Sequence, residues 1–270
     1  MKKLLTFAVA LIATTLVSCS PQPTNLTLPN CTASLVGTEA IKTQAGNNAL
    51  RVYFEITNTS EAILSPFSAL EINAEQSGKP LDSDFVWDQA VPEDAYYGLG
   101  VYPGVTLRFS LIYPLTDTSK VQFKVGAPGE DPLLTTSVSP KHTTPPKTPF
   151  TPTPISAPTR VSGLPDSGTI GGQLEVAIKD AKMADGKLTV SYQLTNHSKA
   201  EKSFDMVVET YAYQDGIELL PVATDTGDAV APGKTTTATI TYSLRTQSPV
   251  EVTLGLASKP QLGKLISLSD

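Results

Sequence analysis

The sequence predicts an all-β protein, and three observations support this prediction. Threonine, which favours strands and turns, outnumbers leucine by 34 to 29 among the 270 residues. The chain holds 22 prolines and only 17% charged residues, a composition that disfavours long helices and coiled coils. Several segments alternate between apolar and polar residues, the period of a strand with one buried face. We therefore expect antiparallel sheets, and the length suits two small domains.

The N-terminal residues predict export and lipidation. Lys2 and Lys3 precede the apolar stretch Leu4–Val17, which is shorter than the ~20 residues that a membrane-spanning helix needs. The stretch runs into Leu16-Val17-Ser18-Cys19, which resembles the lipobox of bacterial lipoproteins. The resemblance implies that residues 1–18 are removed as a signal peptide and that the Cys19 thiol carries a diacylglycerol, with palmitate among its acyl chains. Acylation of the new amino group stays open. The alternative is an ordinary signal peptide in which Cys19 has no role.

The expected anchor sets the expected location and partners. A lipid on Cys19 would hold the chain on the cell membrane, facing the extracytoplasmic side. Loss of Lys2 and Lys3 changes the net charge from −6 to −8, because −6 − 2 = −8. This acidic balance disfavours nucleic acid as a partner. With Cys19 lipidated, Cys31 has no disulfide partner, and we expect it to be a small buried side chain in an opening strand.

Two parts of the chain are copies of each other. Residues 50–60 align without a gap with residues 188–198, at an offset of 138. From Val101 onward the offset is 129, with Val101-Tyr102-Pro103-Gly104 opposite Val230-Ala231-Pro232-Gly233. The first copy therefore carries 138 − 129 = 9 extra residues, which lie between Leu81 and Val101.

Each copy predicts the same succession of strands. The alternating segments lie near residues 51–57, 107–115 and 121–125, and again near 189–195, 238–244 and 250–254. Gly-containing turns at 76–79 and 214–217 predict hairpins. Roughly seven short strands per copy, with turns at regular spacing, are typical of an immunoglobulin-like sandwich. The fold prediction is therefore two tandem immunoglobulin-like β-sandwich domains.

Composition gives the predicted domain boundaries. Nine prolines fall from Pro132 to Pro165, among Thr, Ser and Lys, and such a stretch prefers extended polyproline II. We expect a tether over residues 19–30, domain 1 over 31–131, a Pro/Thr-rich spacer over 132–168, and domain 2 over 169–270.

The combination of lipobox, Pro/Thr spacer and repeated pattern resembles a known family. The repeated pattern comprises Thr-Asn-x-Ser from Thr57 and Thr195, Pro-Gly from Pro103 and Pro232, and the later alternating strands. It resembles the immunoglobulin-like lipoprotein domains of unknown function of Gram-positive bacteria, over most of residues 31–268. The resemblance implies an extracellular β-sandwich without known catalytic residues.

The nine-residue insertion carries the candidate binding loop. Aromatic and acidic side chains are interleaved there, a mixture that suits protein recognition or sugar stacking. The candidate residues are Asp82, Asp84, Trp87, Asp88, Glu93, Asp94, Tyr96 and Tyr97. The alternatives are a solvated loop with Trp87 and one tyrosine in the core, or a cation site. Because the loop lacks the spacing of a calcium-binding EF-hand, we expect no metal.

The sequence predicts no catalysis. His142 lies in the spacer and His197 in a turn, so neither suggests a triad, and no phosphate loop or zinc motif is present. We expect no cofactor and a non-catalytic binding or structural module, with a surface protein or glycan as ligand. The alternatives are an accessory, immunity or assembly lipoprotein, and a cell-wall-acting hydrolase using carboxylates of the Asp82–Asp94 loop.

Overall fold

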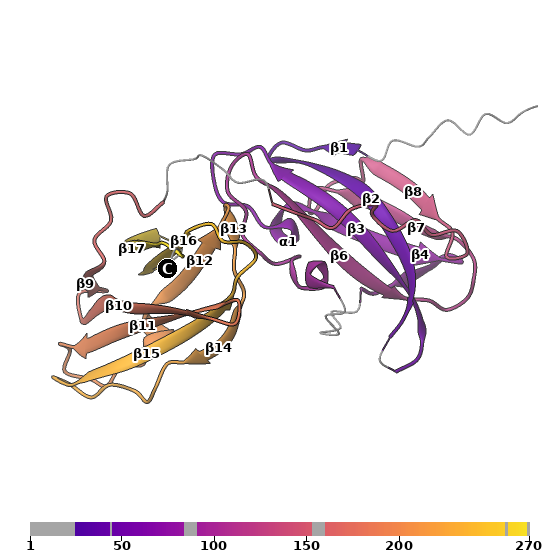
Figure 1. The fold of residues 1–270 in the computed structure, drawn as a ribbon. Coiled ribbons are helices and arrows are strands. Elements are labelled where there is room, and N and C mark those ends of the chain that lie inside the picture. The colour runs from indigo at the N-terminus through magenta and orange to yellow at the C-terminus, as the bar shows by residue number, and fades with distance from the viewer. Residues whose placement is uncertain (1–24, 44, 84–90, 153–159, 257–258, 269–270) are drawn as a thin grey trace, which may run out of the picture.

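The computed structural model describes residues 25–43, 45–83, 91–152, 160–256 and 259–268, and Figure 1 shows two all-β units side by side. The strands form four sheets in which every strand pair is antiparallel. The all-β prediction is therefore confirmed. We refer to the two units as the first and second repeat.

The first repeat contains two sheets. One has the order β1 (Asn25–Thr27), β2 (Cys31–Lys42), β3 (Asn48–Asn58) and β6 (Thr106–Pro114). The other has the order β5 (Lys79–Leu81), β4 (Glu71–Gln76), β7 (Val121–Gly126) and β8 (Leu134–Val138). Two single-turn helices complete the repeat: α1 (Pro66–Ala69) and the 3₁₀ helix η1 (Pro92–Ala95).

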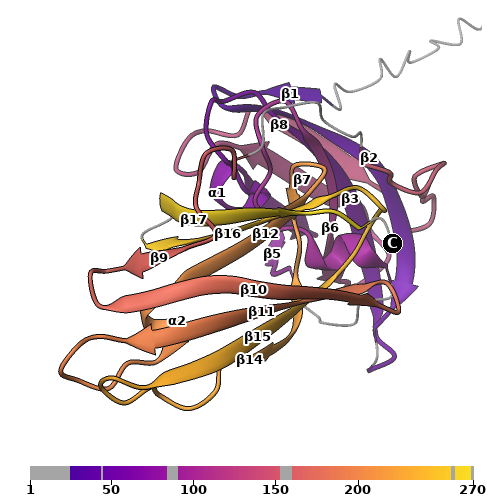
Figure 2. The ribbon, with the colours of Figure 1, turned by 60° about the vertical axis from the view of Figure 1, so that its left-hand side comes forward.

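The second repeat has the same plan (Figure 2). Its larger sheet has the order β14 (Pro221–Asp225), β15 (Thr235–Ser243), β11 (Lys187–Asn196), β10 (Leu174–Ala184) and β9 (Ser167–Ile170). Its smaller sheet has the order β13 (Ile217–Glu218), β12 (Glu209–Gln214), β16 (Val250–Leu256) and β17 (Lys259–Ile266). The helix α2 (Phe204–Val207) lies at the position of α1, at the offset of 138.

The apolar residues of the predicted alternating segments form the cores. In the first repeat, Phe54 of β3 stacks on Phe109 of β6, with 5.6 Å between ring centroids. Tyr113 of β6 meets Phe123 of β7 at 5.3 Å, so the two sheets share one core. Cys31 is buried as expected, and burial raises the pKa of its thiol.

Two buried polar side chains recur at the offset of 138. Asn58 Nδ2 donates to the carbonyl oxygens of Ala62 and Val101, at 2.7 and 2.8 Å. Its counterpart Asn196 makes the same two bonds to Ala200 and Val230. Gln76 and Gln214 likewise bridge backbone groups of the loop that precedes β7 or β16. These side chains satisfy buried carbonyls that would otherwise lack partners.

Parts of the predicted tether and spacer are built into the sheets. β1 lies within residues 19–30, and β8 and the first two residues of β9 lie within residues 132–168. The segment Leu134–Val138 precedes the dense proline run and is rich in Thr and Val, so it can pair with β7.

The proline-rich segment that follows lies against the first repeat. Thr38 N donates to the carbonyl of Thr144 at 2.9 Å, and Arg108 Nη1 donates to that of Thr148 at 2.7 Å. Gly37 lets Pro146 approach, because a Cβ at this position would lie 2.6 Å from the proline Cδ. Residues 144–148 of the predicted spacer are therefore packed onto a sheet.

Candidate functional site

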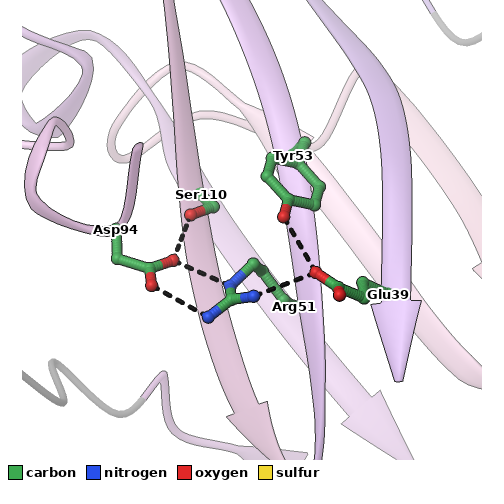
Figure 3. A network of polar contacts seen from close by, with 5 residues as sticks. All are labelled: Glu39, Arg51, Tyr53, Asp94 and Ser110. Carbon is green, nitrogen blue, oxygen red and sulfur yellow. Dashed lines mark hydrogen bonds and ion pairs between the residues drawn. The ribbon is translucent and has the colours of Figure 1, made fainter. Parts of the chain in front are cut away.

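The insertion of the first repeat is fixed to a sheet by a buried ion pair (Figure 3). η1 places Asp94 over the outer face of the sheet, where its two oxygens accept bonds from Arg51 Nε and Nη2 at 2.9 and 3.0 Å. Ser110 Oγ also donates to Asp94. Only 4% of the Arg51 side chain and 2% of the Asp94 side chain are exposed. Because breaking a buried ion pair costs about 3–5 kcal/mol, this contact holds the insertion in one place.

The other side of Arg51 completes the network. Glu39 Oε2 accepts from Arg51 Nη1 and from the Tyr53 hydroxyl, both at 2.9 Å. Burial and the bond to Glu39 raise the pKa of Tyr53 to about 12. Burial acts to lower the pKa of Arg51, but the carboxylates of Asp94 and Glu39 outweigh this and raise it. The Arg51 guanidinium is therefore charged, and its hydrogen bonds go to residues of the first repeat.

The two tyrosines of the insertion point to different repeats. The Tyr97 ring packs into the first repeat, with its centroid 5.3 Å from Phe109 and 5.7 Å from Phe67. The Tyr96 ring contacts the second repeat, where the Arg245 guanidinium lies 4.9 Å from its centroid. The insertion thus connects the two repeats.

The chain after the insertion pairs with β13 through its backbone. Val101 and Ile217 form an antiparallel bridge. Glu218 N donates to the Gly100 carbonyl at 2.9 Å, and Tyr102 N donates to the Gly216 carbonyl at 2.8 Å. These bonds extend the smaller sheet of the second repeat by a segment of the first.

Side-chain contacts between the two repeats surround this backbone pairing. The rings of Tyr102 and Tyr213 lie 4.8 Å apart, and the Tyr102 hydroxyl donates to Glu251 Oε2 at 3.1 Å. Glu218 Oε2 accepts from Gly100 N at 2.7 Å. Tyr213 and Ile217 of the second repeat pack into the hydrophobic core of the first repeat. We call this contact region, residues 96–102 against residues 213–218, 245 and 251, the junction.

Arg245 of the second repeat stabilises the junction through hydrogen bonds to β13. Its Nη1 donates to the Ile217 carbonyl at 3.2 Å, and its Nη2 donates to the Glu218 carbonyl. Burial lowers the pKa of Arg245. Burial also raises the pKa of Glu218, although the Gly100 amide and Arg245 oppose this shift.

A cleft of about 410 Å³ opens beside the junction. Its walls come from both repeats and from the segment that joins them. The first repeat contributes Ala62, Ile63, Ser65, Ser68, Gly98 and Gly100, and the rest of the chain contributes Arg160, Glu209, Tyr211, Tyr213, Glu218, Thr253, Gly255, Lys259 and Pro260. This volume lies in the range of small-molecule sites.

The predicted loop residues separate into three groups. Asp94, Tyr96 and Tyr97 make contacts within the protein, as described above. Asp82 is exposed, and Glu93 lies half-buried in η1. Asp84, Trp87 and Asp88 lie outside the described residues, and so does Cys19.

The sequence reasoning missed the junction residues of the second repeat. The available signal was a difference between the copies rather than a likeness. Four junction residues differ in kind from their counterparts: Tyr102 aligns with Ala231, Tyr213 with Glu75, Glu218 with Pro80, and Arg245 with Thr116.

Comparison with known proteins identifies the family. The family described as Domain of unknown function (DUF5067) matches residues 20–126 and 171–255, and the chain belongs to this family. No curated protein matches the chain. Among solved structures, the chain is similar to a candidate lipoprotein from Staphylococcus aureus subsp. aureus NCTC 8325. The TM-score is 0.38 at 13% identity, over 44% of this chain and 89% of that chain.

The described residues offer neither a metal site nor a membrane-spanning helix. Within the described ranges, no three His, Cys, Asp or Glu side chains gather closely enough to hold a metal ion. In the same part of the chain, no helix has the length and hydropathy needed to cross a membrane.

Proposed function

We propose that this protein is a lipid-anchored cell-surface lipoprotein that acts as a non-catalytic binding or structural module at the bacterial envelope. The lipobox-like sequence that ends at Cys19 supports the anchor. β1 begins at Asn25, six residues after Cys19, and this short separation would hold the first repeat near the membrane.

We further propose that each repeat is an immunoglobulin-like sandwich. The order β10-β11-β15-β14 in the second repeat corresponds to strands A-B-E-D of a constant-type immunoglobulin domain, and β12-β16-β17 corresponds to C-F-G. The first repeat follows the same order with β2-β3-β6 and β4-β7-β8. Among its described residues no strand pairs with the outer edge of β6, and η1 packs beside that strand instead.

The junction is the observation that carries the proposal of a fixed two-domain module. Three kinds of contact hold the junction: backbone pairing of Val101 with Ile217, ring packing of Tyr102 on Tyr213, and the hydrogen bond from Arg245 to the Ile217 carbonyl. A linker alone would leave two such domains free to move, whereas an interface with shared core residues favours one arrangement. One arrangement gives the cleft between the repeats a constant shape, which a binding site needs.

The chemistry of the insertion supports a non-catalytic role. A general acid or base must reach a substrate, but both oxygens of Asp94 are bound to Arg51 and its side chain is 2% exposed. The hydrolase alternative would therefore have to work without the Asp94 carboxylate.

The lipid anchor is tested by metabolic labelling. A bacterium that expresses the full chain is labelled with radioactive palmitate, beside the same chain with Cys19→Ala. We expect label and membrane association for the natural chain, and unlabelled protein in the medium for the variant. Equal labelling of both chains would contradict the anchor.

The binding role is measured separately on isolated cell envelopes. The mature chain carrying Cys19→Ser should bind them saturably and release no soluble wall fragments. Absence of saturable binding would contradict the binding role, and release of fragments that Asp84→Ala abolishes would establish the hydrolase instead.

A further inference from the structure

The floor of the cleft is the outer face of the smaller sheet of the second repeat. Tyr211 of β12 lies directly opposite Thr253 of β16, and Glu209 lies opposite Gly255. Since successive side chains of a strand alternate between faces, Glu209, Tyr211 and Tyr213 point to the same side of β12. All five of these residues line the cleft.

This floor differs from the equivalent face of the first repeat. At offsets of 138 and 129, Tyr211 corresponds to Asn73, Tyr213 to Glu75 and Thr253 to Lys124. In the first repeat, Lys124 forms an ion pair with Glu75 at 2.7 Å, and Asn73 donates to Glu71 at 3.0 Å. Both copies thus carry a polar pair two residues apart, since the Tyr211 hydroxyl donates to Glu209 Oε2 at 3.5 Å. The first copy adds the Lys124–Glu75 ion pair, whereas the second carries tyrosines there and borders a cleft.

Tyr211, which is partly buried, forms an aromatic platform, and the Tyr213 ring beside it is 3% exposed and packs against Tyr102 in the junction. The rings of Tyr211 and Tyr213 are stacked, with 6.4 Å between centroids and 29° between planes. An aromatic side chain offers a large apolar surface. The C–H groups on one face of a saturated ring can pack against such a surface. The platform therefore suits a ligand with an apolar ring face and a polar rim.

The charges around the platform cancel. Arg160 and Lys259 contribute two positive charges, and Glu209 and Glu218 contribute two negative charges, so the lining sums to zero. A cleft selective for a phosphate or a polyamine would show an excess of one sign. Carboxylates that accept and cations that donate are instead suited to a neutral ligand with many hydroxyl groups.

The cleft also contains an unsatisfied hydroxyl. Thr253 is 1% exposed, and its Oγ1 has no hydrogen-bond partner within the described structure. Buried polar atoms are normally paired, and among the buried unpaired hydroxyls of the described residues Thr253 Oγ1 is the one whose residue lines this cleft. A ligand hydroxyl in the cleft would supply that partner, because a hydroxyl can donate and accept at the same time.

We propose that the cleft binds a neutral saccharide, with a sugar ring on the Tyr211 face and sugar hydroxyls at Thr253 and Glu209. This inference rests on the proposed binding role and names the class of ligand. The net-neutral lining, the aromatic platform and the unpaired threonine point to the same class.

The test uses the mature chain carrying Cys19→Ser and saturation-transfer NMR. The probes are cellobiose, maltose, lactose and diacetylchitobiose at millimolar concentration, beside glucuronic acid and an uncharged tripeptide amide. We expect at least one of the four neutral disaccharides to bind, and glucuronic acid and the tripeptide not to bind. Tyr211→Ala should weaken that binding about tenfold or more, equivalent to ~1.4 kcal/mol. Thr253→Val, which removes the hydroxyl but keeps the shape, should weaken it about threefold.

The controls separate the site from the fold. Asn73→Ala changes the matching position of the first repeat and should leave the affinity unchanged. Melting temperatures of all variants identify any that fail to fold. If Tyr211→Ala does, Tyr211→Leu replaces it: this variant keeps an apolar side chain but removes the aromatic face, and the affinity should fall.

Three results would overturn part or all of the saccharide proposal. Binding that Tyr211→Ala and Thr253→Val leave unchanged would overturn the cleft as the site while keeping the binding role. Binding of the tripeptide or of glucuronic acid in place of the disaccharides would overturn the ligand class. Failure of all probes would overturn the saccharide inference, and saturable binding to cell envelopes would then still support the proposed function.

Discussion

The ring of Tyr102 in the first repeat packs against the ring of Tyr213 in the second, with 4.8 Å between their centroids. The Tyr102 hydroxyl donates to Glu251, and the residues on either side of Tyr102 pair with β13. Burial raises the pKa of both tyrosines well above the ordinary range, so the two remain neutral at physiological pH. This contact makes the two repeats share part of one core.

Tyr102→Ala should destabilise the whole chain. It removes a 3% exposed ring from the junction and leaves Glu251 without one of its donors. Loss of a buried aromatic ring costs about 3–5 kcal/mol in a core, and we expect about 2–4 kcal/mol here. The free energy of unfolding from urea denaturation measures the effect. Val222→Ala, at a 50% exposed position of β14, is the control and should change it by less than about 0.5 kcal/mol.

The strands could be predicted from the sequence, but the junction could not. Alternation of Val52, Phe54 and Ile56 marks a buried face whatever lies beyond the sheet. Which outer faces meet depends on contacts between residues more than 100 positions apart, such as Tyr102 and Glu251. A single strand pattern carries no information about them. The positions where the copies diverge, Tyr102 against Ala231 for example, are the best indicator that one sequence offers.

Asp94→Ala should release the insertion from the sheet. The substitution leaves Arg51 buried and without its main counter-charge, a change that costs about 3–5 kcal/mol. Urea denaturation measures the loss. The double variant Arg51→Met with Asp94→Leu should be less destabilised than Asp94→Ala, because no buried charge remains unpaired. Equal stability of Asp94→Ala and the natural chain would contradict the role given to this pair.

The stability of the junction should depend on pH through Glu218. Burial raises the pKa of this carboxyl in the folded state above its ordinary value. Stability from this group is therefore fully present below the unfolded pKa and is lost as the pH rises through the raised folded value. Glu218→Gln keeps a side-chain oxygen for Gly100 but does not titrate.

The comparison of these two chains is made by urea denaturation between about pH 4 and about pH 7. The natural chain should lose stability relative to Glu218→Gln as the pH rises. A difference that stays constant over this range, or one that changes in the opposite sense, would contradict the assignment.

Asn58→Ala and Asn196→Ala should destabilise the chain by similar amounts. Each side chain is at most 1% exposed and bonds two backbone carbonyls in the same geometry. Loss of such a group leaves buried acceptors unpaired and costs about 2 kcal/mol. Melting temperatures of the two variants test this equivalence, and a large shift in only one of them would show that the two sites are not alike.

The partners of Asn58 and Asp94 could not be predicted from the sequence, because both side chains bond residues far away in the chain. Thr-Asn-x-Ser predicts a turn, and the Asn58 side chain does accept from Ser60 N at 2.9 Å. Its burial and its bond to Val101, 43 residues away, follow from the packing of the loop that leads into β6. In the same way Asp94 belongs to an acidic segment that looks solvated in sequence, and only the fold brings Arg51 beneath it.

The central claim is that the junction holds the two repeats in one arrangement. Spin labels at Lys120→Cys and Lys182→Cys, two exposed positions on different repeats, report their separation by pulsed electron resonance. Cys31 is buried and should stay unlabelled. We predict one narrow distance distribution for the mature chain carrying Cys19→Ser, and a broad one when Tyr102→Ala and Arg245→Ala are combined in it. A broad distribution in the chain with an intact junction would contradict the claim.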